Sequence, residues 1–216
     1  MKRVALIDYG SGNLPSAQKA LQTAARALGS EHEIVVTADP ETVAAADRVV
    51  LPGVGAFAAC MNALRARSGL IEAMTEAVQV RGRPFLGVCV GMQLLATRGL
   101  EFGVHKGLGW IPGEVAKLTP SDPRAKVPHM GWNALILAEG APHPLLEGQK
   151  PHPHMYFTHS YAFTPEDEAV VAAGVDHAGQ FAAVVAKGNV AGVQFHPEKS
   201  QAAGLKLIGR FLEWAP

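Results

Sequence analysis

The first hundred residues alternate short β-branched runs with alanine- and leucine-rich amphipathic segments. Such alternation is typical of βα units that build a parallel sheet with helices on its faces. It predicts strands at 3–8, 33–37, 47–51 and 84–88, and helices at 15–28, 56–66, 70–80 and 91–97. We therefore expect an α/β fold whose functional groups lie at the carboxyl edge of the sheet.

The pattern changes from about Gly107 onward, where strand-like runs are separated by glycine and proline. Several runs follow one another at hairpin-like intervals, which indicates a mixed or antiparallel sheet in this half. The runs lie at 114–118, 132–137, 155–163, 168–173, 181–187 and 190–195, and a closing helix is expected at 201–214. The proline-rich stretch 141–155 predicts a loop, because proline breaks helices. A chain of 216 residues fits a single domain, 1–216.

The charge balance excludes some classes of partner. The chain has 19 basic and 19 acidic residues, so nothing in its composition indicates the positive surface expected for binding nucleic acid or an anionic membrane. The first apolar run meets Asp8 and is too short for a signal peptide, and no stretch reaches the roughly 18 apolar residues of a membrane span. We expect a cytoplasmic protein that binds small polar or zwitterionic molecules.

Of the two cysteines, only Cys89 has neighbours that indicate chemistry. Cys60 lies in a helical pattern, AFAACMNAL, where a thiol is expected to serve as a small core hydrophobe. Cys89 lies in GVCVGMQ, where a predicted strand meets a helix. In such an elbow the nucleophile takes a strained backbone conformation, and the flanking glycines relieve clashes between strand and helix. The helix N-terminus favours the thiolate. A buried cysteine in a tight turn stays the alternative until a base is found.

The candidate base is His196 in VAGVQFHPEKS. The chain has nine histidines, but this one ends an apolar strand and precedes Glu198 by two residues. Residues i and i+2 of an extended segment point to the same side, so Glu198 can reach the imidazole and hold its tautomer. Pro197 between them fixes an extended or turned backbone. If both strand ends lie at the carboxyl edge of the sheet, Cys89, His196 and Glu198 converge there.

Two glycine-rich turns and a histidine pair have competing interpretations. The first turn, DYGSGNLPSAQ, has two glycines of the dinucleotide motif but Pro15 at the third position, so we favour a tight turn. In the second, LPGVGAF, Gly53 and Gly55 permit a flipped peptide at Val54 that could aim an N–H at an anion; a plain turn is the alternative. The His152 and His154 pair lacks further ligands nearby, so no metal is expected.

Cys89 in GVCVGMQ with His196 and Glu198 in HPE resembles the Cys-His-Glu triad of class I glutamine amidotransferases. The resemblance covers nearly the whole chain. The segments DYGSGNL, LPGVGAF, KVPHMGWN, THSY and HPEKS resemble the glutaminase-subunit branch found in imidazole glycerol phosphate synthases. Val90 and Met155 depart mildly from that pattern. The family implies a flavodoxin-like fold, with a mostly parallel central sheet flanked by helices and a mixed C-terminal half.

The resemblance also implies an activity and its residues. L-Glutamine would be hydrolysed by Cys89 without a cofactor, and the oxyanion would be met by the N–H of Val90 and one from Gly53–Val54 after a peptide flip. Matching family positions that line the glutamine site are Gln93, Ser160 and Tyr161.

A separate (β/α)₈ cyclase subunit is implied as the partner that receives the ammonia, because protonated ammonia is unreactive in bulk water. The positions at or near that interface are Trp132, Asn133, Tyr156 and Lys199. The family further implies that the glutaminase is nearly idle until the cyclase and its nucleotide bind. The alternatives are the glutaminase of another synthase, a related Cys-His γ-glutamyl hydrolase, and a catalytically silent binding subunit.

Overall fold

The computed structural model describes residues 1–140 and 142–216. Its centre is an eight-stranded sheet with the order β2-β1-β3-β4-β14-β13-β12-β9. Five neighbouring strands run parallel: β2 (His32–Thr37), β1 (Lys2–Ile7), β3 (Arg48–Gly53), β4 (Phe85–Cys89) and β14 (Val190–Val193). Antiparallel pairing then adds β13 (Gln180–Lys187), β12 (Val171–Asp176) and β9 (Ile136–Leu137). The predicted parallel sheet with a mixed C-terminal half is confirmed, and its parallel part has the flavodoxin-like order.

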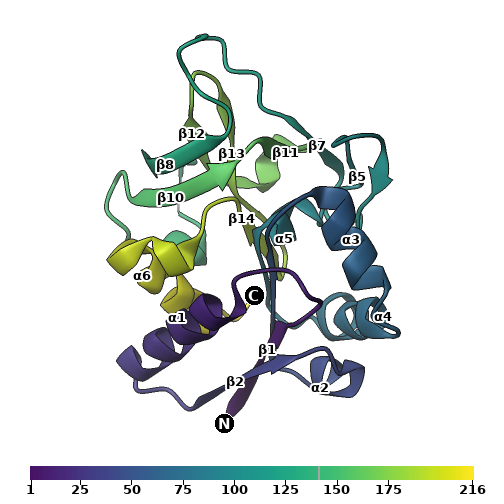
Figure 1. Cartoon of the computed structure of the whole chain (residues 1–216). Coiled ribbons are helices and arrows are strands. Elements are labelled where there is room, and N and C mark those ends of the chain that lie inside the picture. The colour runs from purple at the N-terminus through teal and green to yellow at the C-terminus, as the bar shows by residue number, and fades with distance from the viewer. Residues whose placement is uncertain (141) are drawn as a thin grey trace.

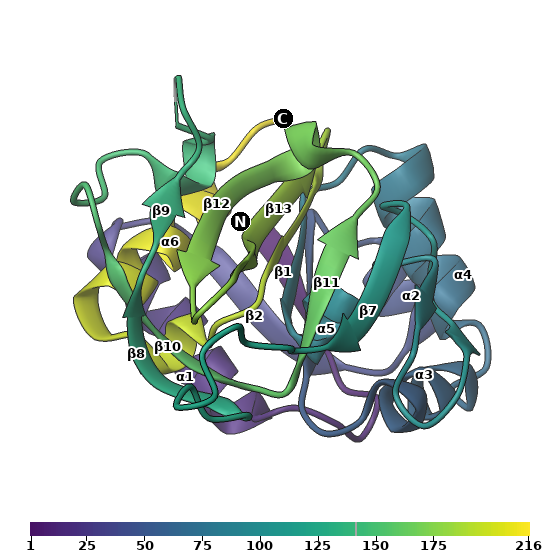
Figure 2. The same cartoon turned by 90° about the horizontal axis from the view of Figure 1, so that it is seen from above.

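Helices cover both faces of this sheet, as Figures 1 and 2 show. One face carries α1 (Leu14–Ala27), which packs on α6 (Gln201–Glu213). The other carries α3 (Phe57–Arg65) and α4 (Leu70–Thr75), with α2 (Pro40–Ala44) packed on α4. Because both faces are covered, the central strands are buried along their whole length, as in β3 and β4.

Two smaller sheets complete the structure. A two-stranded ribbon pairs β8 (His129–Ala134) with β10 (His154–His159), and Figure 1 shows it above α6. A four-stranded sheet joins β11 (Tyr161–Pro165), β7 (Gly113–Lys117), β5 (Arg98–Gly99) and β6 (His105–Lys106). The prediction of one strand at 155–163 is therefore wrong. The chain changes sheets at Ser160, since β10 and β11 pair with different partners. The predicted strand 132–137 likewise divides between β8 and β9.

The predicted helix at 91–97 is also too long, because α5 spans only Val90–Gln93. The carbonyls of Leu94, Leu95 and Ala96 accept N–H groups from the segment 108–111 instead of continuing the helix. Hydrogen bonds to a distant segment have thus replaced those that would continue the helix. The predicted helix at 70–80 is present as α4 followed by a π-helical turn at Glu76–Val80.

Several shorter segments differ from the prediction in detail. The run 168–173 begins as a 3₁₀ turn, Glu168–Val170, before β12, and β14 ends at Val193 rather than 195. Residue 141, the first of the predicted loop 141–155, lies outside the described residues. The remainder contains a 3₁₀ turn at Pro144–Leu146 and the start of β10. Among the described helices, none has the length and apolar character needed to cross a membrane.

Candidate active site

Cys89 occupies a strained elbow between β4 and α5. Its backbone has φ 54° and ψ −113°, a left-handed region that residues other than glycine rarely adopt. An ideal Cβ on Gly87 would lie 2.5 Å from the carbonyl oxygen of Gly91, and one on Gly91 would overlap the carbonyl oxygen of Leu51. The two glycines are therefore required because the backbones of strand and helix touch, which is the reason the sequence suggested.

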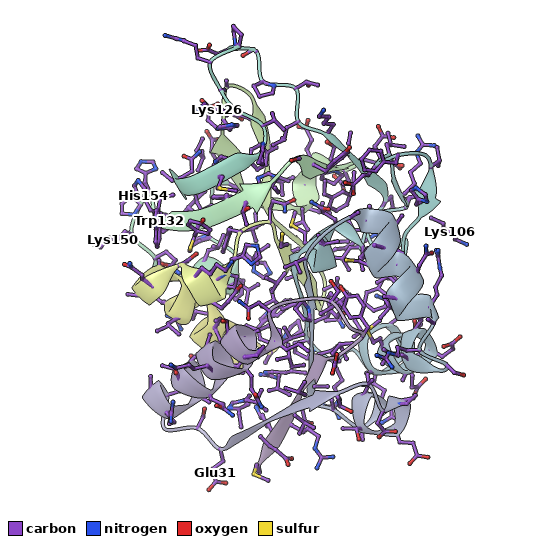
Figure 3. The ribbon with its side chains drawn as sticks, viewed as in Figure 1. Glu31, Lys106, Lys126, Trp132, Lys150 and His154 are labelled. Carbon is purple, nitrogen blue, oxygen red and sulfur yellow. The ribbon has the colours of Figure 1, made fainter. Side chains whose placement is uncertain are left out.

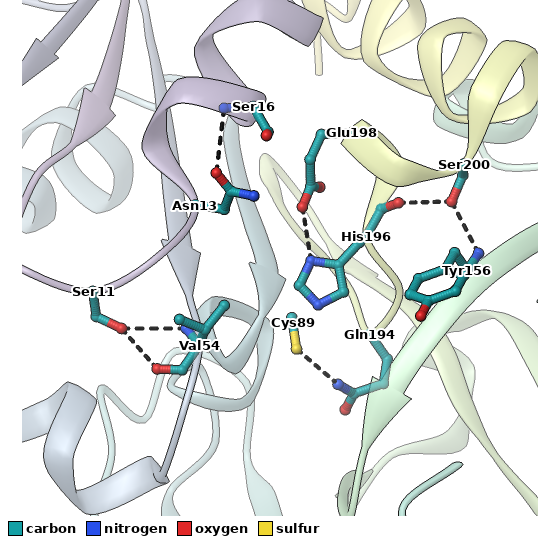
Figure 4. A network of polar contacts seen from close by, with 10 residues as sticks. All are labelled: Ser11, Asn13, Ser16, Val54, Cys89, Tyr156, Gln194, His196, Glu198 and Ser200. Carbon is teal, nitrogen blue, oxygen red and sulfur yellow. Dashed lines mark hydrogen bonds and ion pairs between the residues drawn. The ribbon is translucent and has the colours of Figure 1, made fainter. Parts of the chain in front are cut away.

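His196 and Glu198 lie just beyond the end of β14, the strand beside β4. The Nδ1 atom of His196 is 2.8 Å from Oε1 of Glu198, and both side chains are almost fully buried. Pro197–Lys199 forms a 3₁₀ turn, so of the two backbones expected around Pro197, extended or turned, the structure has the turned one, and it brings the carboxylate back to the imidazole. Figure 4 shows the imidazole between the carboxylate and Cys89.

The environment of His196 favours the imidazolium form. Burial lowers the pKa of His196, but hydrogen bonding to Cys89 and Glu198 and the charges of both outweigh it and raise the pKa to about 9. The Nδ1–H donates to Glu198, which fixes the ring orientation. A protonated imidazole facing a thiol is the arrangement that supports a thiolate–imidazolium pair.

A cavity of about 320 Å³ opens above the elbow, and its walls include both Cys89 and His196. The predicted residues that line it are Val54, Val90, Gln93, Ser160, Tyr161 and Lys199. Glu101 also lines it, and sequence reasoning missed this residue because a glutamate in a short connection carries no pattern. With Glu101 and Lys199 the wall offers one carboxylate and one ammonium group. This pair of charges complements a zwitterionic amino acid.

A second histidine in the cavity wall, His159, has a different character. Its Nδ1 lies 2.8 Å from the carbonyl oxygen of Tyr161, which can only accept, so Nδ1 carries the proton. Its Nε2 then accepts from Nδ1 of His129 at 3.1 Å. Burial lowers the pKa of His159 to about 4, so this ring is neutral at neutral pH. Of the two histidines in the wall, only His196 has the protonation state of a general acid.

The N–H and carbonyl of Val54 face away from Cys89. Its N–H donates to Oγ of Ser11 at 3.2 Å, and that hydroxyl donates to the carbonyl of Val54 at 2.8 Å. Figure 4 shows Ser11 on the side of Val54 opposite Cys89. The buried thiol of Cys60 also contacts the Val54 carbonyl, at 3.3 Å. In this orientation the N–H of Val54 is not available to an oxyanion on a substrate attacked by Cys89.

The first glycine-rich turn, at residues 8–12, contacts and supports the second one, at residues 52–55. In addition to the Ser11 bonds, the hydroxyl of Tyr9 donates to the carbonyl of Pro52 at 2.8 Å. A Cβ on Gly12 would lie 2.9 Å from Cβ of Pro52. The DYGSG segment is thus a tight turn, as favoured from the sequence. Its role as a support for the 53–55 turn was not visible there, because the two segments are about forty residues apart.

Three of the four predicted interface residues lie together. The rings of Trp132 and Tyr156 meet edge to face with centres 6.0 Å apart, and Nζ of Lys199 lies 5.9 Å from the centre of the Tyr156 ring. Figure 3 shows Trp132 at the outer edge of the molecule, near His154. Asn133 follows on the opposite face of β8, where its amide donates to the carbonyl of Asp176 at 2.8 Å. Only the first three therefore share one surface.

Within residues 1–140 and 142–216, no group of three histidine, cysteine or acidic side chains is close enough to hold a metal ion. His152 and His154 lie beside Trp132 around a separate surface cavity, with Lys150 and Lys206 nearby. These neighbours are cationic, so this surface does not suit a cation.

The chain is similar to known proteins over nearly its whole length. The model of the family described as glutamine amidotransferase class-I matches residues 5–213. The imidazole glycerol phosphate synthase subunit HisH of Caulobacter vibrioides is 61% identical over 216 residues, and the match covers all of both chains. The protein of the same name from Rhodospirillum rubrum is 58% identical over 214 residues, covering 99% of this chain and 100% of that one.

Solved structures with much lower identity share the fold. A structure described as a glutamine amidotransferase has a TM-score of 0.71 at 21% identity and covers 97% of each chain. Another, from Thermotoga maritima, has a TM-score of 0.66 at 16% identity, covering 98% of this chain and 96% of that one. At such identities the likeness is one of architecture.

Proposed function

The chain belongs to the class-I glutamine amidotransferase family, and from this premise we propose that it hydrolyses L-glutamine with Cys89 as nucleophile, His196 as general acid and base, and Glu198 as the group that orients His196. The observation that carries the proposal is the strained backbone of Cys89 opposite the buried His196–Glu198 pair. A nucleophile, a base and an orienting carboxylate at one sheet edge form the constellation of acyl-transfer catalysis.

The reaction proceeds in two steps. The Cys89 thiolate attacks the carboxamide carbon, and the C–N bond breaks as His196 gives its proton to the departing ammonia. This leaves a γ-glutamyl thioester and a neutral imidazole. A water molecule then gives a proton to His196 and attacks the thioester, which releases glutamate and returns the thiolate–imidazolium pair. The N–H of Val90 and, after the peptide at Gly53–Val54 flips away from Ser11, an N–H from that turn stabilise the oxyanion in both steps.

Glutamine is held by the cavity wall above Cys89. Glu101 provides a carboxylate for the α-ammonium group, and Gln93, Ser160 and Tyr161 line the remainder of the site. A single carboxylate beside the reactive elbow favours an amino acid over a substrate that carries only negative charge.

The ammonia passes to a (β/α)₈ cyclase subunit, with formation of imidazole glycerol phosphate and an aminoimidazole carboxamide ribotide in histidine biosynthesis. Two similar curated proteins are named as subunits of imidazole glycerol phosphate synthase, which supports an assembly of this kind. The surface formed by Trp132, Tyr156 and Lys199 adjoins the turn Pro197–Lys199 and carries exposed aromatic area, which suits a protein interface.

Ammonia release from glutamine, measured with and without the cyclase subunit and its nucleotide ligand, tests the whole proposal. We expect little release from the isolated chain, because the N–H of Val54 faces Ser11. Adding both partners should raise the rate by roughly tenfold to a hundredfold or more, the usual range of allosteric coupling. Rapid hydrolysis by the chain alone, or no response to the cyclase, contradicts the proposed coupling.

Ser11→Ala is expected to raise the glutaminase activity of the isolated chain. The hydroxyl of Ser11 bonds both the N–H and the carbonyl of Val54 in the inactive orientation. Each such bond contributes about 1 kcal/mol net, so its loss should increase the population of the flipped peptide, and the basal rate, by about fivefold or more. The measurement is ammonia release without partner. Ser121→Ala, which removes another exposed side chain-to-backbone hydrogen bond far from the site, is the control. A reduced basal rate in Ser11→Ala would mean that the hydroxyl supports the active orientation.

A further inference from the structure

Gln194 is a wholly buried amide beside the reactive sulfur. It follows β14 directly and precedes His196 by two residues, and none of its surface is exposed. Its Nε2 lies 3.8 Å from Sγ of Cys89, a separation compatible with a hydrogen bond to the large sulfur atom. Figure 4 shows the amide and the imidazole approaching the sulfur from different directions. A buried amide has to be satisfied, so its partners determine what it offers to Cys89.

The hydrogen-bond network fixes the direction of this amide. Nε2 of Gln93 lies 3.0 Å from the carbonyl oxygen of Tyr161, which can only accept, so the NH₂ group of Gln93 points there. The same NH₂ group lies 3.0 Å from Oε1 of Gln194 and donates to it. The oxygen of Gln194 is thereby occupied as an acceptor, and its NH₂ group is directed at Cys89. Both the oxygen and the NH₂ group of the Gln194 amide then have a hydrogen-bond partner.

The short helix after Cys89 increases the importance of such a donor. A sulfur at a helix N-terminus is stabilised as thiolate by the helix dipole, but α5 has only four residues, Val90–Gln93. A single turn supplies a small part of the dipole of a full helix. The negative charge on the sulfur therefore depends more on direct donors, and within the described residues Gln194 adds to His196 in this role.

We propose that Gln194 is a catalytic residue that donates an amide N–H to the Cys89 thiolate, and that Gln93 is the positioning residue that sets its direction. The proposal rests on the proposed role of Cys89 as nucleophile. Because the charge leaves the sulfur when the thioester forms, the bond stabilises the resting thiolate. The bond raises the fraction of molecules in which Cys89 is a thiolate and makes each thiolate somewhat less nucleophilic.

The rate of Cys89 alkylation by iodoacetamide as a function of pH, followed by peptide mass spectrometry on the full chain, tests this directly. In Gln194→Met, which keeps much of the volume and removes the donor, we expect the pH midpoint to rise by about one unit. Below the midpoint the alkylation rate should fall about fourfold. The thiolate fraction drops roughly tenfold, but each remaining thiolate is about 2.5 times more nucleophilic. Gln149→Met, at a distant amide that donates to Ala203, serves as the control and should leave the profile unchanged.

Gln93→Met provides an independent variant. It removes the donor that occupies Oε1 of Gln194, so the amide of Gln194 can rotate, and a smaller shift in the same direction is expected. If Gln194→Met does not fold, the pH profile of Cys89 alkylation in Gln93→Met tests the proposal by itself. A midpoint equal to that of the unsubstituted chain in every folded variant overturns the proposal and leaves Gln194 a packing residue. Alkylation does not require glutamine turnover, so the inference can fail while the proposed function, tested by glutaminase assays on Cys89 variants, stands.

Discussion

Cys89→Ala, assembled with the cyclase subunit and its nucleotide, is expected to release no measurable ammonia from glutamine. The thiolate is the only group in the proposed mechanism that forms the acyl intermediate, so its loss should lower the glutamine-dependent rate by about 10⁴-fold or more. Supplied ammonia should still support product formation, because the ring-forming chemistry belongs to the partner. The two rates, measured on one preparation, separate loss of the nucleophile from loss of assembly.

The second cysteine supplies the matched control for this experiment. Cys60 is buried and does not line the cavity, and its contact with the Val54 carbonyl belongs to the orientation of the isolated chain, so Cys60→Ala should keep glutamine hydrolysis in the assembled enzyme within about tenfold. Retained glutamine hydrolysis in Cys89→Ala would remove the assignment of the nucleophile. Loss of the ammonia-dependent rate as well would show that the substitution had damaged the complex, and Cys89→Ser would then be the variant to compare.

The elements that hold Cys89 and His196 could be predicted because local sequence signals agree there. The apolar runs that become β4 and β14 predict buried strands, and the glycines around Cys89 predict a tight junction. Parallel neighbours place their carboxyl ends at one edge, which brings His196 toward Cys89. The pairing of β4 with β14 itself is a long-range contact, and in the sequence only the resemblance of HPE to the family indicated it.

The parts that could not be predicted depend on contacts between distant segments. The alanine- and leucine-rich run after Gln93 has helical propensity, but the segment 108–111 takes the carbonyls of Leu94, Leu95 and Ala96. The support of Val54 by Ser11 has the same character, since a serine in a glycine-rich turn has no pattern that reveals its partner. Tertiary contacts thus determine both where α5 ends and how the backbone of Val54 is oriented.

The short helix α2 was not predicted from the sequence, although its first residues carry a capping signal. Pro40–Ala44 forms α2, and its N-cap Asp39 accepts from the N–H of Thr42 at 2.9 Å. An aspartate followed by proline is a strong helix-start pattern. The short length of the segment, five residues, gave too little periodicity to recognise a helical face. Capping signals therefore identify helices that are too short for periodicity to reveal.

Gly91→Ala is expected to abolish the elbow that makes Cys89 reactive. The new methyl group would overlap the carbonyl oxygen of Leu51, a backbone atom of the central strand β3 that cannot move independently. Relief requires α5 to shift away from β3, which also displaces the N–H of Val90. We expect a loss of about 3 kcal/mol or more in the free energy of unfolding, which for a chain of this size lowers Tm by roughly 6–12 °C. Thermal unfolding and Cys89 alkylation are the measurements.

A glycine with room for a methyl group distinguishes this clash from the general effect of replacing glycine. At Gly174 in β12 the nearest atom to an ideal Cβ is the carbonyl oxygen of Phe181 at 3.5 Å, an ordinary contact. Gly174→Ala should therefore change the unfolding free energy by less than about 1 kcal/mol, in either direction. If Gly91→Ala were as stable and reactive as Gly174→Ala, α5 could not lie against β3 as described. The strained conformation of Cys89 would then need another cause, since contact between these two backbones is what forces the chain to turn at the nucleophile.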